Sequence, residues 1–282
     1  MDGILPIDKP RDMSSRKLCS EVKRLLAAKK VGSTGTLDPH ASGLMLLCVN
    51  NATKLVSVLQ KLDKEYLALA KFHSDVKRTQ LTRVLERFKG EIVQIPPKRS
   101  SVARRPRKRR VYELKVLEFG KREAKIYVKC EAGTYVRKLI HDIGTKLGGA
   151  HLQELRRIAI GHFRVEDAVS FEEFVRSKDR EKFLLPMERC IKHLKRVTLK
   201  WGSVKGALKG APIFRPGILG YESRPDKGEV VAVFSPSDDL IALGKWIGGN
   251  IALRIDRVIR PNYKPNKRRQ EKQSSWQKLI SR

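Results

Sequence analysis

Along residues 3–90, short apolar runs typical of buried strands alternate with stretches whose apolar residues recur at helical spacing. Ser14 and Ser15 are residue types that favour a helix N-cap, and Gly90 follows the last helical stretch as a C′ glycine would. A glycine-rich loop covers residues 31–39. The pattern predicts strands at residues 3–7, 44–49 and 66–72, and helices at residues 14–26, 55–62 and 81–88.

Further along the chain, the pattern divides into two regions. Residues 111–119 and 124–130 alternate apolar and polar on either side of Gly120, which predicts a hairpin. Helices follow at residues 134–147 and after Ser170, where Glu173 completes a capping box. From about residue 192 to residue 260, short strands separated by turn residues predict a small barrel or sandwich. We therefore expect an α/β domain at residues 1–192, a β-rich domain at 193–260 and a basic, loosely packed tail at 261–282.

The charge balance adds to this picture of the fold a class of binding partner. The chain has 61 Lys and Arg against 30 Asp and Glu, a formal net charge of +31. Such an excess favours binding to a polyanion, and nucleic acid fits best because neutralised phosphates release counterions. A diffusely basic surface adapted to hot or salty conditions is the alternative. The cations cluster, however, between Pro96 and Arg110, at Lys98, Arg99, Arg104, Arg105, Arg107, Lys108, Arg109 and Arg110.

This cationic cluster contains Pro97 and Pro106, so we expect residues 98–110 to form a charged loop rather than a face of a regular element. A solvated excursion is the ordinary interpretation of such a run, but its density favours RNA contact. We therefore expect it to act as a lid that clamps RNA.

Cysteine usage and hydropathy indicate the compartment. The 4 cysteines stand far apart, without a CxxC pair or the histidine spacing of a zinc site. No basic, apolar leader opens the chain, and no apolar run approaches the roughly 18 residues of a membrane span. We expect a cytoplasmic protein in a reducing environment, without membrane association.

One segment combines glycines with an acidic residue: Gly32-Ser33-Thr34-Gly35-Thr36-Leu37-Asp38-Pro39. By itself an Asp-Pro pair in such a loop is most often a turn or a cap. The loop lacks the closing Gly-Lys-Ser/Thr of a phosphate-binding P-loop. A carboxylate repels RNA phosphates, so its presence in so cationic a chain suggests a chemical role for Asp38.

The same segment resembles the signature of TruB-type pseudouridine synthases, in which a Gly-Thr-Leu-Asp-Pro loop carries the nucleophile. Five further motifs of that family occur in the same order along residues 3–163. They are Asp8-Lys9-Pro10 with Ser14-Ser15, Asn51-Ala52-Thr53-Lys54, Asp63-Lys64-Glu65-Tyr66, Gly133-Thr134-Tyr135-Val136-Arg137 and Leu155-Arg156-Arg157. The sequence departs from the family at Ser33, where a histidine thought to help displace the target base is usual, and at Asp12 and Asn50, where glycine is common.

Two stretches resemble the dyskerin-like, box H/ACA branch of this family. The first is the run from Gln94 to Val102 with its arginine-rich continuation. The second is the link from Phe72 to Leu81, which is short. In addition, the segment from Gly210 to Ile218, which includes Arg215, resembles the turn of a PUA domain. The resemblance implies a mixed, largely antiparallel sheet with flanking helices, followed by a PUA barrel. It also implies that Gly210 and Arg215 contact RNA.

The resemblance further implies the roles of individual residues in turning uridine into pseudouridine, a reaction that needs no cofactor and no metal. Asp38 would act as the nucleophile, Tyr66 would stack on the flipped base and could accept the C5 proton, and Arg137 would hold Asp38 ionised. The substrate-binding residues would be Tyr135, Leu155, Ser33 and Thr36. Without the resemblance, Tyr66 and Leu155 would be ordinary core residues and Arg137 a surface cation.

Three functional alternatives stay open at this point. The first is guide-RNA-directed modification of rRNA as the catalytic subunit of an H/ACA ribonucleoprotein, together with small accessory proteins. The second is guide-independent modification of tRNA. The third is a non-catalytic RNA scaffold, for which the serine at position 33 is the argument. A ribosome-associated binding protein without enzymatic ancestry would leave the ordered motifs unexplained.

Overall fold

The computed structural model describes residues 1–96 and 103–264, and the chain forms two compact units. The first unit spans Gly3–Leu184 and the second begins at Leu185. The expected boundary at residue 192 lies a few residues inside the second unit. The two units are described separately below.

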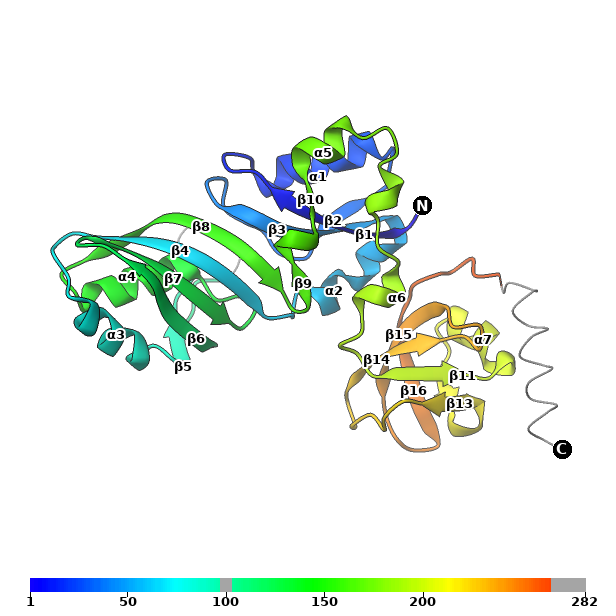
Figure 1. Cartoon of the computed structure of the whole chain (residues 1–282). Coiled ribbons are helices and arrows are strands. Elements are labelled where there is room, and N and C mark those ends of the chain that lie inside the picture. The colour runs from blue at the N-terminus through cyan, green and yellow to red at the C-terminus, as the bar shows by residue number, and fades with distance from the viewer. Residues whose placement is uncertain (97–102, 265–282) are drawn as a thin grey trace. The chain divides into compact units, whose positions relative to one another are not determined.

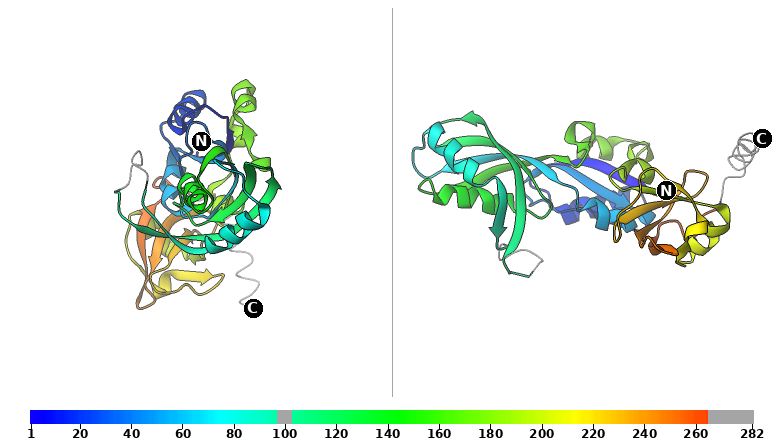
Figure 2. Two further views of the ribbon diagram at one scale, coloured as in Figure 1. Left: turned by 90° about the vertical axis from the view of Figure 1, so that its left-hand side faces the viewer. Right: turned by 90° about the horizontal axis from the view of Figure 1, so that it is seen from below.

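The first unit is built on a 10-stranded mixed sheet with the order β10-β1-β3-β8-β4-β7-β6-β5, in which β2 pairs with β3 and β9 with β8. Among the strands within the described residues, only β1–β10 and β3–β8 of this sheet pair in parallel, so the sheet is largely antiparallel, as expected. The long strands β4 and β8 run side by side and curve across the unit (Figures 1 and 2). The strands are β1 Gly3–Lys9, β2 Val31–Ser33, β3 Ser42–Val49, β4 Lys64–Phe72, β5 Gly90–Gln94, β6 Arg107–Phe119, β7 Glu123–Cys130, β8 Ala150–Ile160, β9 Phe163–Arg164 and β10 Val169–Ser170.

Strand β3 is buried on both of its faces, which explains why its sequence is a continuous apolar run rather than an alternating one. Met45 and Leu47 belong to the core cluster that also contains Leu18 and Val22 of helix α1. Because successive side chains point to opposite faces, Leu44, Leu46 and Cys48 are buried on the other side.

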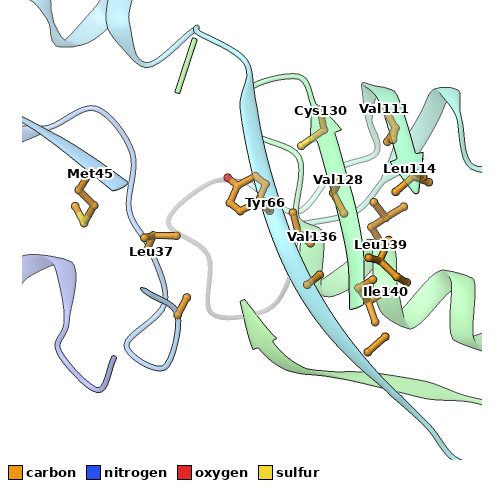
Figure 3. Close-up of a cluster of buried hydrophobic side chains, with 14 of the residues drawn as sticks. Leu37, Met45, Tyr66, Val111, Leu114, Val128, Cys130, Val136, Leu139 and Ile140 are labelled. Atoms are coloured by element: carbon orange, nitrogen blue, oxygen red, sulfur yellow. The ribbon is translucent and has the colours of Figure 1, made fainter. Parts of the chain in front are cut away.

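Helices α1 and α5 begin where the sequence pattern predicts. The hydroxyl of Ser14 accepts a hydrogen bond from Lys17 at the start of α1, and Ser170 caps α5 in the same way. Helices α3 and α4 cover the face of β7 that carries Ala124, Ile126 and Val128; Figure 3 shows Leu139 and Ile140 of α4 against this cluster. The helices are α1 Ser15–Leu25, α2 Val56–Leu59, α3 Arg78–Arg87, α4 Val136–Thr145 and α5 Phe171–Arg176, with 3-10 turns at Asn50–Leu55, Val165–Asp167 and Glu181–Phe183.

The second unit contains a six-stranded sheet with the order β12-β16-β15-β14-β11-β13, in which only β11 and β14 pair in parallel. Its core lies around Val233, Ile241 and Trp246. The β-rich architecture was expected, whereas helix α7 was not. The elements are α6 Met187–Cys190, β11 Arg196–Leu199, α7 Trp201–Leu208, β12 Ile213–Phe214, a 3-10 turn at Arg215–Gly217, β13 Ile218–Tyr221, β14 Val230–Phe234, β15 Leu240–Trp246 and β16 Ile251–Val258.

Three local expectations are wrong. The cations from Arg107 to Arg110 do not lie in a loop: they open strand β6, which is hydrogen-bonded to β5. Their side chains alternate between half-buried and exposed, so a strand accommodates them without burying a charge. The helix expected at residues 55–62 is a 3-10 turn followed by the short α2. Gly90, with φ +88, opens β5 instead of occupying the C′ position of α3.

Candidate active site

Asp38 lies in a β-turn between strands β2 and β3. The turn is closed by a 3.1 Å hydrogen bond from the backbone N–H of Ala41 to the carbonyl oxygen of Asp38, with Pro39 at its second position. The side chain of Asp38 is 49% exposed, so a ligand can reach the carboxylate.

Arg137, in the first turn of helix α4, donates a hydrogen bond from Nη2 to Oδ2 of Asp38. The two residues are 99 positions apart in the sequence, and the tertiary fold alone brings them together. A guanidinium and a carboxylate in this geometry form a charge-assisted hydrogen bond, which fixes the orientation of the carboxylate. The pair therefore presents an oriented carboxylate at a solvent-accessible position.

Two buried side chains fix the backbone on either side of Asp38. The hydroxyl of Ser15 donates to the carbonyl of Leu37 at 2.8 Å and accepts from its N–H at 2.9 Å. The ammonium of Lys9, which has no exposed surface, donates to the carbonyls of Pro39 and Met13 at 3.0 and 2.7 Å. Burial lowers the pKa of Lys9, and the nearby Arg157 lowers it further. The loop is thus held from both sides by α1 and by the end of β1.

Arg157 of strand β8 connects the loop to the sheet beneath it. Its Nε donates to the carbonyl of Leu44 at 2.7 Å and its Nη2 to that of Gly35 at 3.2 Å, although the residue is only 2% exposed. Gly43, with φ +108, allows this approach, because a Cβ there would lie 2.2 Å from the carbonyl oxygen of Arg157. Arg157 also hydrogen-bonds the side chain of Tyr66.

Tyr66 is 7% exposed and extends from β4 toward the segment that carries Leu37 (Figure 3). Burial raises the pKa of its phenol, and the negative charge of Asp38 acts in the same direction. The phenol therefore keeps its proton at neutral pH. Its ring offers an apolar surface beside the Asp38 loop, whereas accepting a proton would first require loss of its own.

Of the other expected substrate-binding residues, Tyr135 is the N-cap of α4 and lies two residues before Arg137. The side-chain amide of Gln94 forms two hydrogen bonds with the backbone of Tyr135. The N–H of Tyr135 donates to Oε1 of Gln94 at 3.0 Å, and Nε2 of Gln94 donates to the carbonyl of Tyr135 at 3.2 Å. Leu155 is partly buried against the core, opposite Ala68 of β4. The side chain of Thr36 is exposed on the loop.

Ser33 ends strand β2 and is half-buried. Its hydroxyl bonds the thiol of Cys19 in α1, whose pKa is raised by burial. The hydroxyl is thus engaged with the protein itself. The adjoining Thr34 is 1% exposed, and among the described residues its Oγ1 has no hydrogen-bond partner.

The predicted RNA-contacting cations differ in exposure and in their contacts. Arg104 and Arg105 are exposed, and Arg107 is half-buried in β6. Lys108 is exposed and forms a 2.9 Å ion pair with Glu91 of β5. Lys98 and Arg99 lie outside the described residues.

In the second unit, Gly210 has φ +79 in the turn after α7. The guanidinium of Arg215 donates to the carbonyl of Gly248 at 3.0 Å and remains exposed.

Within the described ranges, no set of three or more His, Cys, Asp or Glu side chains is arranged to hold a metal ion. All four cysteines lie within these ranges, and none of them forms a disulfide. Over the same ranges, every helix is too short or too polar to cross a membrane.

Sequence reasoning did not single out Lys9, Ser15, Gln94 or Arg157, although each holds part of the site. A fully buried lysine or arginine is rare, but burial cannot be read from sequence. A signal existed for Lys9 and Ser15, because both stand in the opening motif. Gln94 likewise opens the run from Gln94 to Val102, and Arg157 closes the motif Leu155-Arg156-Arg157.

Family models match along most of the chain. The model described as TruB family pseudouridylate synthase (N terminal domain) matches residues 23–79 and 73–136. The tRNA pseudouridylate synthase B C-terminal domain matches residues 137–192, and the PUA domain matches residues 195–247.

Relatives and solved structures agree with these matches. A probable tRNA pseudouridine synthase B of Pyrobaculum islandicum is 40% identical, over 95% of this chain and 89% of its own length. One of Pyrococcus horikoshii is 39% identical, over 92% and 84%. A crystal structure of a Cbf5-Nop10-Gar1 complex is similar with a TM-score of 0.82 and 36% identity, covering 91% of this chain and 84% of that one. A structure of an H/ACA RNP bound to a substrate RNA containing 2'-deoxyuridine has a TM-score of 0.81 and 33% identity, covering 93% and 87%.

The α/β unit with its acidic turn and the β-rich unit that follows are those of an RNA-modifying isomerase with a PUA domain. The chain belongs to the TruB family of pseudouridine synthases. The expectations for the fold class and for the type of enzyme are confirmed.

Proposed function

We propose that this pseudouridine synthase acts on rRNA as the guide-directed catalytic subunit of an H/ACA ribonucleoprotein that also contains small accessory proteins. The likeness to the two H/ACA structures, over more than nine-tenths of this chain, supports the assembly. The curated relatives are named for tRNA, which supports guide-independent modification of tRNA as the second candidate.

The reaction breaks the N1–C1′ bond of uridine, turns the uracil and forms a C5–C1′ bond, while the C5 proton is lost and N1 gains one. In our proposal the ionised carboxylate of Asp38 attacks or stabilises the sugar carbon, as a glycosidase carboxylate does. Arg137 keeps that carboxylate charged and aimed. Tyr66 supplies a surface on which the extruded base stacks, which offsets part of the cost of unstacking. Tyr135 and Leu155 pack beneath base and arginine, and Ser33 and Thr36 shape the loop.

The single observation that carries the catalytic proposal is the ion pair between Asp38 and Arg137. An exposed ion pair on its own stabilises a protein by at most about 1 kcal/mol. A tightly braced loop that presents such a carboxylate, in a chain of net charge +31, is better explained by chemistry than by stability.

The first test replaces Asp38 with asparagine and follows tritium release from C5-labelled uridine in RNA. We expect RNA affinity to change less than about twofold, because no cation is lost, while tritium release disappears. Asp75→Asn is the matched control, because Asp75 is 47% exposed and also pairs with an arginine, Arg122, at 2.6 Å. Turnover by the Asp38 variant would remove the nucleophile assignment.

The second test separates the two candidate roles. Tritium release is measured from rRNA and tRNA transcripts, with and without an H/ACA guide RNA and accessory proteins. Release only in the presence of guide supports the ribonucleoprotein role, and release from tRNA without guide supports the second candidate. Absence of release from every mixture would leave only the scaffold interpretation.

We also propose that the cations before and in β6 contact RNA phosphates. Arg104, Arg105, Lys108 and Arg110 are the described cations of this stretch that are exposed. Replacing Arg104, Arg105 and Lys108 with glutamine should reduce the slope of log K against log salt by about 2, at roughly 0.7 per phosphate contact on single strands. An unchanged slope would place the RNA elsewhere.

A further inference from the structure

Two neighbouring turns at the Asp38 site join through a histidine and an aspartate. His40 occupies the third position of the turn that begins at Asp38. Asp12 lies in the turn that follows β1. Nδ1 of His40 lies 2.7 Å from Oδ1 of Asp12, and the two side chains are 80% and 67% exposed.

Both turns rest on the same support. The buried ammonium of Lys9 donates to the carbonyl of Pro39 in one turn and to those of Pro10 and Met13 in the other, at 3.0, 2.8 and 2.7 Å. These hydrogen bonds of Lys9 hold the backbone of both turns in place. They therefore fix the position of the His40–Asp12 pair relative to Asp38.

Stability alone does not account for the pair. An exposed ion pair contributes little to stability, since water screens it and the side chains lose freedom. Asp12 has φ 61, a left-handed conformation that is unfavourable for residues other than glycine, although aspartate tolerates it better than most. A carboxylate at this position also repels RNA. The pair therefore combines a conformational cost with an electrostatic one, which points to a role in binding.

The hydrogen bond to Asp12 orients the imidazole. With Nδ1 donating to the carboxylate, Nε2 is left at the exposed side of the ring. In the neutral ring Nε2 accepts a hydrogen bond, and RNA offers the ribose 2′-hydroxyl as donor. In the protonated ring Nε2 donates, and RNA offers phosphate oxygens as acceptors. Both partners belong to the sugar–phosphate backbone.

We propose that His40, oriented by Asp12, binds the sugar–phosphate backbone of a nucleotide next to the target uridine. The inference rests on the proposed role of Asp38. His40 lies two residues from Asp38 in the same turn, so their Cα atoms are at most about 7 Å apart, and a backbone that presents its C1′ carbon to Asp38 passes within reach of His40. His40 would thus be a positioning contact for the reaction.

The test uses the full chain in the mixture, with or without guide RNA and accessory proteins, in which the native protein releases tritium from a uridine-containing RNA. That RNA is compared with versions that carry one 2′-deoxynucleotide, or one methylphosphonate linkage, immediately 5′ or 3′ of the target. We expect one of these substitutions to lower kcat/KM of the native protein about fivefold, the effect of losing one hydrogen bond. His40→Ala should lose the same factor on unmodified RNA, mostly through KM, and should no longer respond to that substitution.

Two further variants separate orientation from mere presence of the ring. Asp12→Asn keeps the size of the side chain but removes its charge, and we expect it to show a reduced response to the same backbone substitution. His73→Ala is the matched control. His73 is an exposed histidine that also uses a ring nitrogen, Nε2, which lies 3.2 Å from Nδ1 of His151. It follows the end of β4, about 20 Å along the strand from Tyr66, and its replacement should leave the response native.

The outcomes are distinguishable. Loss of the response to the 2′-deoxynucleotide identifies the hydroxyl as the partner of His40, and loss of the response to the methylphosphonate identifies the phosphate. If the His40 variant responds to every substitution as the native protein does, or if the native protein responds to none, the inference is overturned while the role of Asp38 stands. If Asp38→Asn retains turnover, the proposed catalytic role fails first, and this inference with it.

Discussion

Replacing Arg157 with methionine tests whether one buried guanidinium holds the Asp38 loop onto the sheet. Arg157 donates to the backbone carbonyls of Leu44 in β3 and Gly35 in the loop, and it bonds the side chain of Tyr66. Methionine fills a similar volume without any donor. The substitution therefore removes the polar connections and leaves most of the packing.

The expected magnitude follows from the carbonyls left behind. A buried polar group that loses its partner costs about 1–3 kcal/mol, so the carbonyls of Leu44 and Gly35 together cost about 2–6 kcal/mol. Removing a buried positive charge offsets part of this, because its desolvation is no longer required. We expect a net destabilisation of about 3 kcal/mol, which corresponds to a fall in Tm of roughly 6–12 °C for a domain of this size.

The assay is urea unfolding followed by circular dichroism, with tritium release measured on the same preparations. Arg156→Met is the matched control. Arg156 is the neighbouring residue on β8, but its side chain is 40% exposed and it pairs with Asp8 at 2.6 Å. We expect it to cost about 1 kcal/mol or less. Equal losses for the two variants, or a loss below about 1 kcal/mol for Arg157→Met, would refute the idea that buried backbone contacts of Arg157 hold the loop.

Three further predictions follow from the same region. Gly43→Ala should destabilise the first unit by more than about 3 kcal/mol in urea unfolding, because its Cβ would meet the backbone of Arg157 and its φ is +108; near-native stability would contradict this. Burial lowers the pKa of Lys64 from 10.5 to about 8, so the unfolded chain binds this proton more tightly and stability rises with pH from 8 to 10.5. Between pH 8 and pH 10.5 the native protein should therefore gain about 3 kcal/mol in free energy of unfolding relative to Lys64→Met. A difference between the two proteins that does not change with pH would contradict the lowered pKa of Lys64. Gln94→Leu should lower kcat while changing stability by about 2 kcal/mol or less, because its amide holds the backbone of Tyr135; native turnover would show that this contact does not position the site.

Local patterns predicted the elements whose burial is regular along the sequence. Strand β4 alternates strictly between buried and half-buried positions, and α1 places Leu18 and Val22 on a single face beneath a serine cap. The periodicity of apolar residues and the capping serine depend only on residues close together in the sequence. For this reason the positions of β4 and α1 could be predicted. The hairpin of β6 and β7 was predicted for the same reason.

Strand β8 was not predicted as a strand, although it lies in the middle of the sheet. Its residues do not alternate, and Arg157 stands fully buried where a central strand would be expected to carry an apolar residue. The guanidinium is acceptable there only because carbonyls of the Asp38 loop and of β3 receive its hydrogen bonds. No property of residues 150–160 alone reveals those acceptors. The loop assignment at 107–110 failed because composition was read without knowledge of β5, the strand that pairs there. At 55–62 the helix is only shorter than expected, since α2 spans Val56–Leu59.

The sequence by itself determined that this chain carries a large cationic excess, a glycine-rich turn with an acidic residue, and a second β-rich unit. Through its ordered motifs it also identified the family. Only the tertiary structure decided that the carboxylate of Asp38 meets Arg137, and that Asp12 meets His40. The physical reason is strand pairing: Lys9 of β1 lies opposite Gly43 of β3, which brings the turns with Asp12 and His40 together, and the order β3-β8-β4-β7 places the segment after β7 in the same sheet as β3. Such contacts depend on which strands pair, and pairing is a property of the whole sheet rather than of any one segment.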